Sequence, residues 1–535
     1  MPMVTLRYDD LEKLIGAEKD TILDRMPMIG ADVERIGEEH TDVEFFPDRP
    51  DLFSVEGVAR AMRGFLEIET GLPRYDVKSS NVSITIDESI KSIRPYLACA
   101  VVRGLHLDDG SIEPLMSLQE NLHWGVGRDR KKVSIGVHDL SKIKPPFVYK
   151  AADPKIEFVP LDFDYPLTMH EILDIHPKGI KFAHILDGMK RYPLIVDAAD
   201  DVLSFPPIIT SALTMVTDRT KDLFIEVTGM DASVAVALNI VVTALAERGG
   251  RIKSVKIVSN GSEKKMPNLY PTTRSLRVDE ANSLLGLNLK AEEIARNLEK
   301  MRFGATIHEN ELKVEVPAYR ADILHSWDLI EDVAIGYGYD RFKPVFPETA
   351  TIGKTHYIED KFELLTDVMV GLGFSEVMTF TLTNEKVHFD NMRRPRSNVT
   401  KVKHPISMDQ TMVRSSILPS LMEILSFNKH HDLPQKIFEV GEVLIDGKNA
   451  QLLACVSIHS KANFAEIKSI AESVMRELRT EFTIEEADDP AFLEGRRAYV
   501  LVDDRRLGAF GEIHPDVILS FGLDQPIVAF ELDIS

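Results

Sequence analysis

Residues 224–246 read FIEVTGMDASVAVALNIVVTALA, a short apolar run that passes through a turn into a longer one. The first part, Phe224 to Thr228, is rich in β-branched and aromatic residues and predicts a strand. Asp231 is a suitable N-cap for a helix that begins near Ala232. That helix is apolar for most of its length, is interrupted by Asn239 and Thr243, stops at Glu247 and is too short to cross a bilayer. A buried strand followed directly by a buried helix predicts a sheet with a helix packed against it.

Further apolar strands extend this unit to an α/β domain that we assign to residues 91–266. The polar, Gly- and Pro-bounded run Asn260–Pro267 predicts a linker at its end. The expected strands cover residues 98–102, 133–137, 194–197 and 252–258.

The rest of the chain predicts three more domains, so we expect a multidomain α+β protein. The first, residues 1–90, mixes short strands with helices and has Ser54 as the N-cap of one helix. Residues 267–346 form a small winged-helix-like block, with helices at 278–285, 291–301 and from 326, and a hairpin at 305–316. Residues 347–535 form a last α+β domain, with a helix at 357–372 and strands at 377–382, 436–445 and 452–459.

Composition limits the functional class. The chain has 535 residues, 44% hydrophobic and 28% charged, which is typical of globular domains and excludes a largely disordered or coiled-coil protein. Its net charge of -22 argues against a protein that coats nucleic acid, although a local basic path for RNA stays open. Two cysteines, Cys99 and Cys455, cannot supply a disulfide framework or a cysteine zinc site. No signal peptide, P-loop or zinc-protease motif is found, and we expect a cytoplasmic protein without a membrane segment.

The end of the first strand offers a candidate binding face. Glu226 and Thr228 are two residues apart on a strand, so their side chains share a face. Small ligands tend to bind beyond the carboxyl ends of strands in α/β sheets, and the loop 206–211 brings more hydroxyl groups. The alternative is an ordinary exposed strand face beside a helix cap.

A second candidate is acidic. Asp328, Glu331 and Asp332 share one face of the helix from residue 326, and Asp322 lies in the loop before it. Oxygen ligands at this spacing suit Mg²⁺ or Ca²⁺. The alternative is a solvated acidic helix face favoured by the helix dipole.

A third candidate combines a His-Asp pair with a basic cluster. His138 and Asp139 end a predicted strand and could take part in acid–base chemistry, or simply form structural hydrogen bonds. The nearby cluster could contact RNA phosphates or be a solvated loop. Its members are Arg128, Arg130, Lys131 and Lys132.

Several segments, in order, resemble the β subunit of phenylalanyl-tRNA synthetase of the archaeal/eukaryotic type over essentially the whole chain. The segment 44–57 resembles its N-terminal signature, and segments 134–139 and 224–231 resemble its B3/B4 editing domain. Other matches are to the B5 domain (274–287, 317–322 and 327–339) and to a class II synthetase-like domain (412–419 and 437–441). The resemblance implies an N-terminal B1-like module, an editing domain, a winged-helix-like B5 domain and a catalytically inactive class II-like antiparallel-sheet domain.

The resemblance also implies residue roles. The family hydrolyses Tyr wrongly attached to tRNA(Phe), which makes Glu226 an expected acceptor for the tyrosine hydroxyl, with Ser204, Thr210 and Thr228 orienting the substrate or a water. Archaeal relatives often have Asp at the position of Glu226 and Asn at that of Thr210. The B5 carboxylates Asp322, Asp328, Glu331 and Asp332 are expected to hold Mg²⁺ at a site shared with the α subunit.

The division of labour follows from a missing motif. The chain lacks a recognisable motif 3 of class II synthetases, so ATP binding and adenylate formation are expected on a separate α subunit within an (αβ)₂ tetramer that acts on tRNA(Phe). A C-terminal anticodon-binding domain of the bacterial type is also expected to be absent. Two alternatives stay open: a free-standing editing hydrolase, and a scaffold for the α subunit in which editing has decayed.

Overall fold

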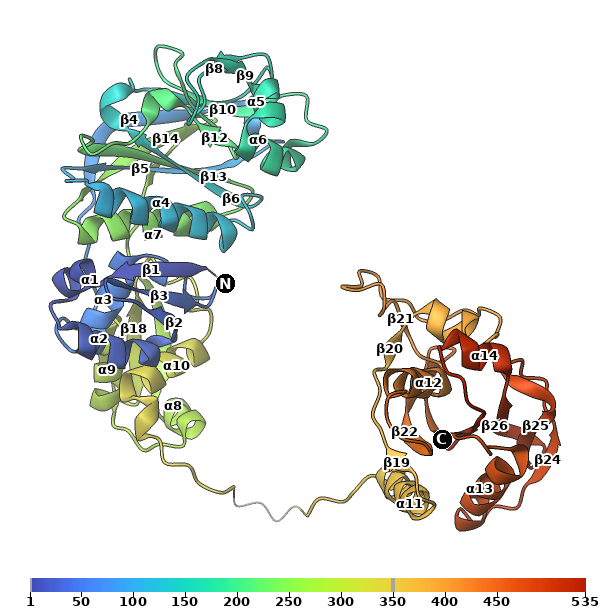
Figure 1. Cartoon of the computed structure of the whole chain (residues 1–535). Helices are drawn as coiled ribbons and strands as arrows, with labels where there is room; N and C mark the ends of the chain where they lie inside the picture. Colours follow the sequence, from blue (N-terminus) through green and yellow to red (C-terminus); the bar gives the residue numbers. More distant parts are fainter. Residues whose placement is uncertain (1, 348–351) are drawn as a thin grey trace. The chain divides into compact units, whose positions relative to one another are not determined.

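The computed structural model describes residues 2–347 and 352–535 and divides into two units (Figure 1). The first unit runs to Val345 and the second starts at Phe346.

The chain begins with a small three-stranded sheet flanked by helices. Its strand order is β1-β3-β2, and α3 begins where Ser54 Oγ accepts a hydrogen bond from the Gly57 backbone N–H, which confirms the predicted N-cap. A Cβ on Gly57 would lie 1.8 Å from the carbonyl oxygen of Asp51, so only glycine lets the preceding loop sit on this helix. The elements are β1 (Met3–Arg7), α1 (Tyr8–Ile15), α2 (Lys19–Arg25), β2 (Ala31–Ile36), β3 (His40–Phe45) and α3 (Val55–Phe65).

A ten-stranded sheet forms the centre of the first unit. Its order is β12-β11-β10-β7-β4-β14-β5-β13-β6, with β15 paired to β14. The strand predicted from residues 224–228 is β13, which lies between β5 and β6 in antiparallel register. The strands are β4 (Lys78–Ile86), β5 (Tyr96–Arg103), β6 (Val133–Asp139), β7 (Phe147–Ala152), β10 (Tyr192–Val196), β11 (Val202–Phe205), β12 (Ile209–Thr210), β13 (Asp222–Gly229), β14 (Arg251–Ser259) and β15 (Ser262–Met266).

Helices α4 (Asp109–Trp124) and α7 (Ser233–Glu247) cover one face of this sheet (Figure 1). The α7 helix contacts β5, β13 and β6, and α3 packs against it from the N-terminal module. Its N-cap is Ala232 rather than the predicted Asp231, whose carboxylate instead accepts a hydrogen bond from the Ser233 N–H at 2.9 Å. The segment between β7 and β10 adds β8 (Glu157–Phe158), β9 (Leu167–Thr168), α5 (Met169–Ile175) and α6 (Pro177–Phe182), with a core of its own.

The predicted linker at residues 260–267 is wrong. Residues 262–266 form β15, which pairs with β14 in a hairpin whose register places Ser259 opposite Ser262. The turn residues Asn260 and Gly261 both have positive φ, at 49° and 77°. Asn-Gly is favoured in two-residue hairpin turns for this reason, and the polar character of the run concealed an edge strand.

The first unit ends with a second three-stranded sheet, of order β16-β18-β17, and three helices. The helices and the hairpin match the predicted helix–helix–hairpin–helix order, while strand β16, which precedes them, was not predicted. The elements are β16 (Thr272–Arg277), α8 (Val278–Leu285), α9 (Ala291–Lys300), β17 (Gly304–His308), β18 (Glu311–Val316) and α10 (Ser326–Tyr337).

The second unit is a mainly antiparallel seven-stranded sheet between two helical layers. Along β23, alternate residues enter different cores: Leu453 and Cys455 pack with α11 and α13, and Ala454 and Val456 pack with α12. Both faces are thus covered, so the strand reads as a continuous apolar run. In sheet order the strands are β19 (Ser375–Glu376), β22 (Gln435–Ile445), β23 (Lys448–Ile458), β27 (Ile527–Asp533), β26 (Arg505–Ile513), β25 (Phe492–Val502) and β24 (Thr483–Glu486), and the helices are α11 (Tyr357–Gly371), α12 (Leu418–Phe427), α13 (Phe464–Glu477) and α14 (Pro515–Ser520).

The strand predicted at residues 377–382 is wrong. Two-residue strands lie on either side of most of this segment, β19 before it and β20 (Leu382–Thr383), which pairs with β21 (Met412–Val413), at its end. Met378 and Phe380 are 94% and 77% exposed. Their alternation resembles a buried strand face, but both residues are exposed in the described part of the chain. Separately, no helix among the described residues has the length and apolarity needed to cross a membrane.

Candidate functional site

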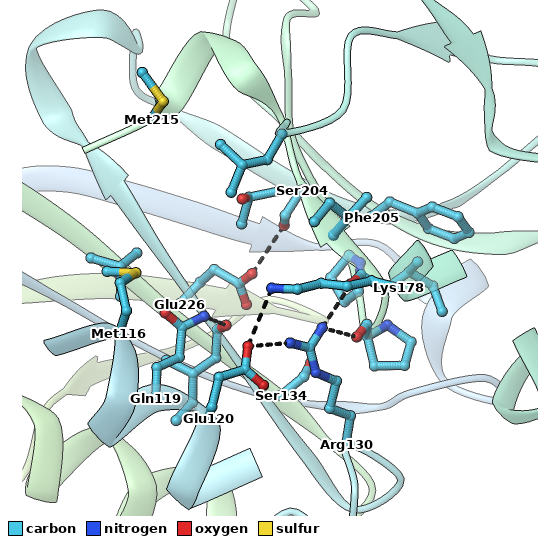
Figure 2. Close-up of a pocket in the computed structure, with 18 of the residues that line it drawn as sticks. Met116, Gln119, Glu120, Arg130, Ser134, Lys178, Ser204, Phe205, Met215 and Glu226 are labelled. Carbon is cyan, nitrogen blue, oxygen red and sulfur yellow. Dashed lines mark hydrogen bonds and ion pairs between the residues drawn. The ribbon is translucent and has the colours of Figure 1, made fainter. Parts of the chain in front are cut away.

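A cavity of about 350 Å³ opens in the first unit beside Glu226 (Figure 2). Three of the four residues expected to act in editing line it: Ser204, Thr210 and Glu226. Most of the remaining wall is apolar, and the loop between β11 and β12 supplies one side of it. These apolar residues include Ile112, Met116, Ile135, Val137, Phe205, Pro206, Pro207, Ile208 and Met215.

The cavity exists because the sheet curls until its two edges approach each other. Ser204 lies on β11, near one edge, and Thr210 is its cross-strand partner on the edge strand β12. Glu226 lies on β13, next to the opposite edge strand, β6. The Ser204 hydroxyl nevertheless donates to Glu226 Oε1 at 3.0 Å (Figure 2). This contact joins strands that are far apart in the order of the sheet.

Glu226 is 2% exposed, and only one of its two carboxylate oxygens has a hydrogen-bond partner among the described residues. Oε1 accepts the Ser204 hydroxyl, while Oε2 is buried without a hydrogen-bond partner among the described residues. Gly136 makes room for this side chain, because a Cβ there would lie 2.3 Å from Oε1. A buried acceptor without a partner costs roughly 1–3 kcal/mol, so the site favours a ligand that brings an O–H or N–H donor.

His138 lies next to the Glu226 carboxylate. Its Nε2 is 3.9 Å from Glu226 Oε1 and has no hydrogen-bond partner among the described residues. Thr214 Oγ1 donates to the Ser211 carbonyl, so it accepts from His138 Nδ1–H at 2.8 Å. Asp139 does not pair with His138. Burial opposes the charge of Asp139, but hydrogen bonds from Ser141 and Thr220 lower the pKa of this carboxyl below its usual range.

Thr228 does not line the cavity, although sequence spacing puts it on the same strand face as Glu226. Its Oγ1 shares a 2.9 Å hydrogen bond with Ser134 and accepts one from Arg94 Nε at 3.0 Å. Arg94, itself 2% exposed, also donates to the backbone carbonyls of Arg130 and Thr228. Thr228 is therefore a supporting residue that fixes Ser134 in the cavity wall.

Of the basic cluster, Arg130 lies in the wall of the cavity, whereas Lys132 lies outside it and is partly exposed. Arg130 is buried, lines the cavity and donates to Glu120 at 2.6 Å and to the carbonyl of Ile208 at 2.7 Å, which ties α4 to the loop of the cavity. Lys178 reaches the same Glu120 oxygen at 3.3 Å (Figure 2). Burial opposes the Glu120 charge, yet His123 and Arg130 lower the pKa of this carboxyl. Lys132 pairs with Asp231 at 3.2 Å. Arg130 is thus an architectural residue.

The four B5 carboxylates do not converge on a common point. Arg320 Nη2 lies 2.6 Å from both Asp322 and Asp332, and its side chain is 2% exposed. One Asp328 oxygen accepts the backbone N–H groups of Leu324 and His325. No group of three or more His, Cys, Asp or Glu side chains among the described residues could hold a metal ion. By themselves, these carboxylates do not fit a Mg²⁺ site.

Glu331 differs from its neighbours. It is exposed and makes no hydrogen bond or ion pair among the described residues. Burial of part of the side chain and the nearby charges of Asp332, Asp48, Asp322 and Asp328 raise the pKa of Glu331. The surroundings of Glu331 therefore favour a cation.

Sequence reasoning missed two residues that shape these sites. Gly136 lies within the strand predicted at residues 133–137, and a glycine inside a strand often marks close approach of another group. Arg320 lies two residues before Asp322 in the sequence, and an arginine beside several carboxylates is a natural partner for them.

Comparisons with known proteins place the chain in a family. Sequence models match the B3/4 domain over residues 111–260, the tRNA synthetase B5 domain over 274–339 and the phenylalanyl tRNA synthetase beta chain CLM domain over 343–534. The phenylalanine–tRNA ligase beta subunit of Methanosarcina barkeri is 57% identical over 538 residues, which cover 100% of this chain and 99% of the relative. The chain belongs to the phenylalanine–tRNA ligase beta subunit family.

Other members of the phenylalanine–tRNA ligase beta subunit family agree. The Archaeoglobus fulgidus protein of that name is 52% identical over 538 residues, covering 100% of this chain and 98% of the relative. A crystal structure of an N-terminal fragment of the phenylalanyl-tRNA synthetase beta subunit from Pyrococcus horikoshii matches with a TM-score of 0.62 and 41% identity, over 63% of this chain and 99% of that one. The predicted multidomain α+β class, with B3/4, B5 and CLM domains, is confirmed.

Proposed function

We propose that this chain is the β subunit of a two-component phenylalanine–tRNA ligase and that its B3/4 cavity hydrolyses Tyr-tRNA(Phe). Synthesis of Phe-tRNA(Phe) from phenylalanine, ATP and tRNA would take place on a separate α subunit, in an (αβ)₂ tetramer. Family membership supports the ligase role, and the β designation of the relatives supports an α partner.

The buried, unpartnered Glu226 Oε2 carries the editing proposal. Tyrosine differs from phenylalanine by one hydroxyl group, and that hydroxyl is the donor this oxygen lacks. A synthetic pocket built for an apolar ring rejects an added hydroxyl poorly, whereas a site that hydrogen-bonds it gains discrimination. In Phe-tRNA the oxygen would stay unpaired, so the cavity would favour the tyrosyl ester.

The chemistry required is hydrolysis of one ester bond. A water oxygen adds to the carbonyl carbon of the tyrosyl group, the bond to the ribose oxygen breaks, and the ribose oxygen takes a proton. The hydroxyls of Ser204 and Thr210 lie across from each other on β11 and β12 and face the cavity. We assign Ser204, which donates to Glu226, to hold that carboxylate for the tyrosine hydroxyl, and Thr210 to orient the ester or the water. Thr228 takes a supporting role through Ser134.

The division of labour has a direct test. We expect the purified chain alone to make no Phe-tRNA(Phe), and the complex copurified with α to make it and to clear added Tyr-tRNA(Phe). Both reactions are followed with labelled amino acids on the same preparation. Charging by the chain alone would contradict the assignment to α, and a complex that charges but never clears Tyr-tRNA would instead support a scaffold with decayed editing.

We further propose that Mg²⁺ at the B5 carboxylates needs ligands from the α subunit, with Glu331 as the main contribution of this chain. The exposed, unpaired Glu331 in an acidic field supports this role, since Asp322 and Asp332 are paired with Arg320. Such a cation would stabilise the subunit contact rather than generate a nucleophile.

Metal removal tests this second proposal. We expect EDTA to weaken α–β association and added Mg²⁺ to restore it, as measured by sedimentation. In the Glu331→Gln variant, the increase in the association constant on adding Mg²⁺ should be about tenfold smaller. Glu292→Gln, on the exposed side of α9, is the matched control. Equal association in EDTA and Mg²⁺ would rule out a metal at the contact.

A further inference from the structure

A second cavity, of about 320 Å³, lies where the N-terminal module, α7 and the B5 domain meet. Its walls come from the segments 72–75, 269–271 and 315–319, together with Thr243 of α7. Three tyrosines and three prolines are among its lining residues: Tyr75, Tyr270, Tyr319, Pro73, Pro271 and Pro317. It shares no residue with the editing cavity.

The inner wall is held by side-chain contacts and contains a hydroxyl group without a hydrogen-bond partner. Tyr319 is 3% exposed, and its hydroxyl has no hydrogen-bond partner among the described residues. The Arg60 guanidinium stacks over the Tyr319 ring at 3.6 Å and also donates to the Tyr75 hydroxyl. Tyr75 in turn donates to Glu247 at 2.6 Å, so both rings are held in place before any ligand arrives.

The rim has the opposite character. Tyr270 is 84% exposed, and Arg74, which also lines the cavity, is exposed and forms no ion pair among the described residues. Glu315, half-buried in the wall, accepts no hydrogen bond there either. The cavity therefore offers an exposed aromatic face, a free cation at the entrance and two unpaired polar groups further in.

We propose that this cavity binds a nucleobase, presented by an unpaired segment of tRNA. A base has a flat face to stack on Tyr270 and an edge whose N–H groups can donate to Glu315 and pair with the Tyr319 hydroxyl. Its phosphate then lies at Arg74. Aromatic stacking combined with an arginine at the backbone is how proteins bind unpaired RNA. A free aromatic amino acid could pair with the charged groups Arg74 and Glu315, but it would not stack on the exposed face of Tyr270.

The proposal concerns tRNA binding and rests on the proposed function only in taking tRNA as the substrate. Binding is measured rather than hydrolysis, so a failure of editing at Glu226 does not affect the result. The probe is transcribed tRNA(Phe), titrated against the complex with α by fluorescence anisotropy.

We expect Tyr270→Ala to weaken tRNA binding about tenfold, as for the loss of one stacked base. Tyr319→Phe removes only the buried hydroxyl and should weaken binding severalfold without altering the fold, which thermal unfolding checks. Tyr165→Ala, an exposed tyrosine of the editing domain at 48%, should leave binding unchanged. Ultraviolet crosslinking of the bound tRNA should label the peptide that contains Tyr270.

A parallel titration with AMP separates the two sources of a base. If both variants lost AMP binding but bound tRNA unchanged, the cavity would bind the base of a free mononucleotide. The nucleobase would then be right and tRNA as its source would be wrong. Unchanged binding of both tRNA and AMP in both variants overturns the proposal. So does saturation by L-phenylalanine that both variants abolish.

Discussion

Replacing Glu226 with alanine is expected to lower the rate of Tyr-tRNA(Phe) hydrolysis by about 100-fold and to leave phenylalanine charging unchanged. Among the described residues, the variant removes the only buried carboxylate that lines the cavity, the one that accepts the Ser204 hydroxyl. A hydrogen bond to a charged group contributes about 1.5–3 kcal/mol, which corresponds to roughly 10- to 150-fold in rate. Both reactions are measured on the complex with α, using preformed Tyr-tRNA(Phe) for hydrolysis.

Two further variants separate recognition from simple disruption. Gly136→Ala keeps the carboxylate but places a Cβ within 2.3 Å of Glu226 Oε1, so hydrolysis should fall although the residue remains. Glu263→Ala, an exposed glutamate on β15, should change neither reaction. Equal loss of charging and hydrolysis in the Glu226 variant would mean that the cavity is not the editing site.

Replacing Arg320 with methionine is expected to destabilise the first unit by about 3–5 kcal/mol. Arg320 is the buried partner of both Asp322 and Asp332, and Asp332 is itself 2% exposed. Removing one side of a buried ion pair leaves carboxylates without compensation, which is far more damaging than losing a surface pair. Thermal and denaturant unfolding of the chain, followed by circular dichroism, measure the change.

A surface arginine provides the comparison. Arg296 pairs with Glu67 at 2.6 Å, with side chains 69% and 39% exposed, so Arg296→Met should cost no more than about 1 kcal/mol. Arg320→Met should stay more destabilising when Mg²⁺ is added. If Mg²⁺ instead restored its stability, the carboxylates would be metal ligands that the arginine merely replaces.

Local patterns predicted most of the elements. The strand–turn–helix of residues 224–246 became β13 and α7, and the helix order of the B5 domain was confirmed. The errors share a cause. Polar residues at 260–267 concealed an edge strand, and the alternation at 377–382 imitated a buried one, because a sequence pattern does not show whether a neighbouring strand is present.

The sequence by itself determined most of the strands and helices, the family and most of the residues at each site, because periodicity, turn residues and motifs are local properties of the chain. Only the tertiary structure decided which of those residues meet. Curling of the sheet brings Ser204 to Glu226 and leaves Thr228 behind Ser134, and packing of the B5 loop turns Asp322 and Asp332 toward Arg320. Such contacts depend on strand order and sheet curvature, which residue spacing does not encode.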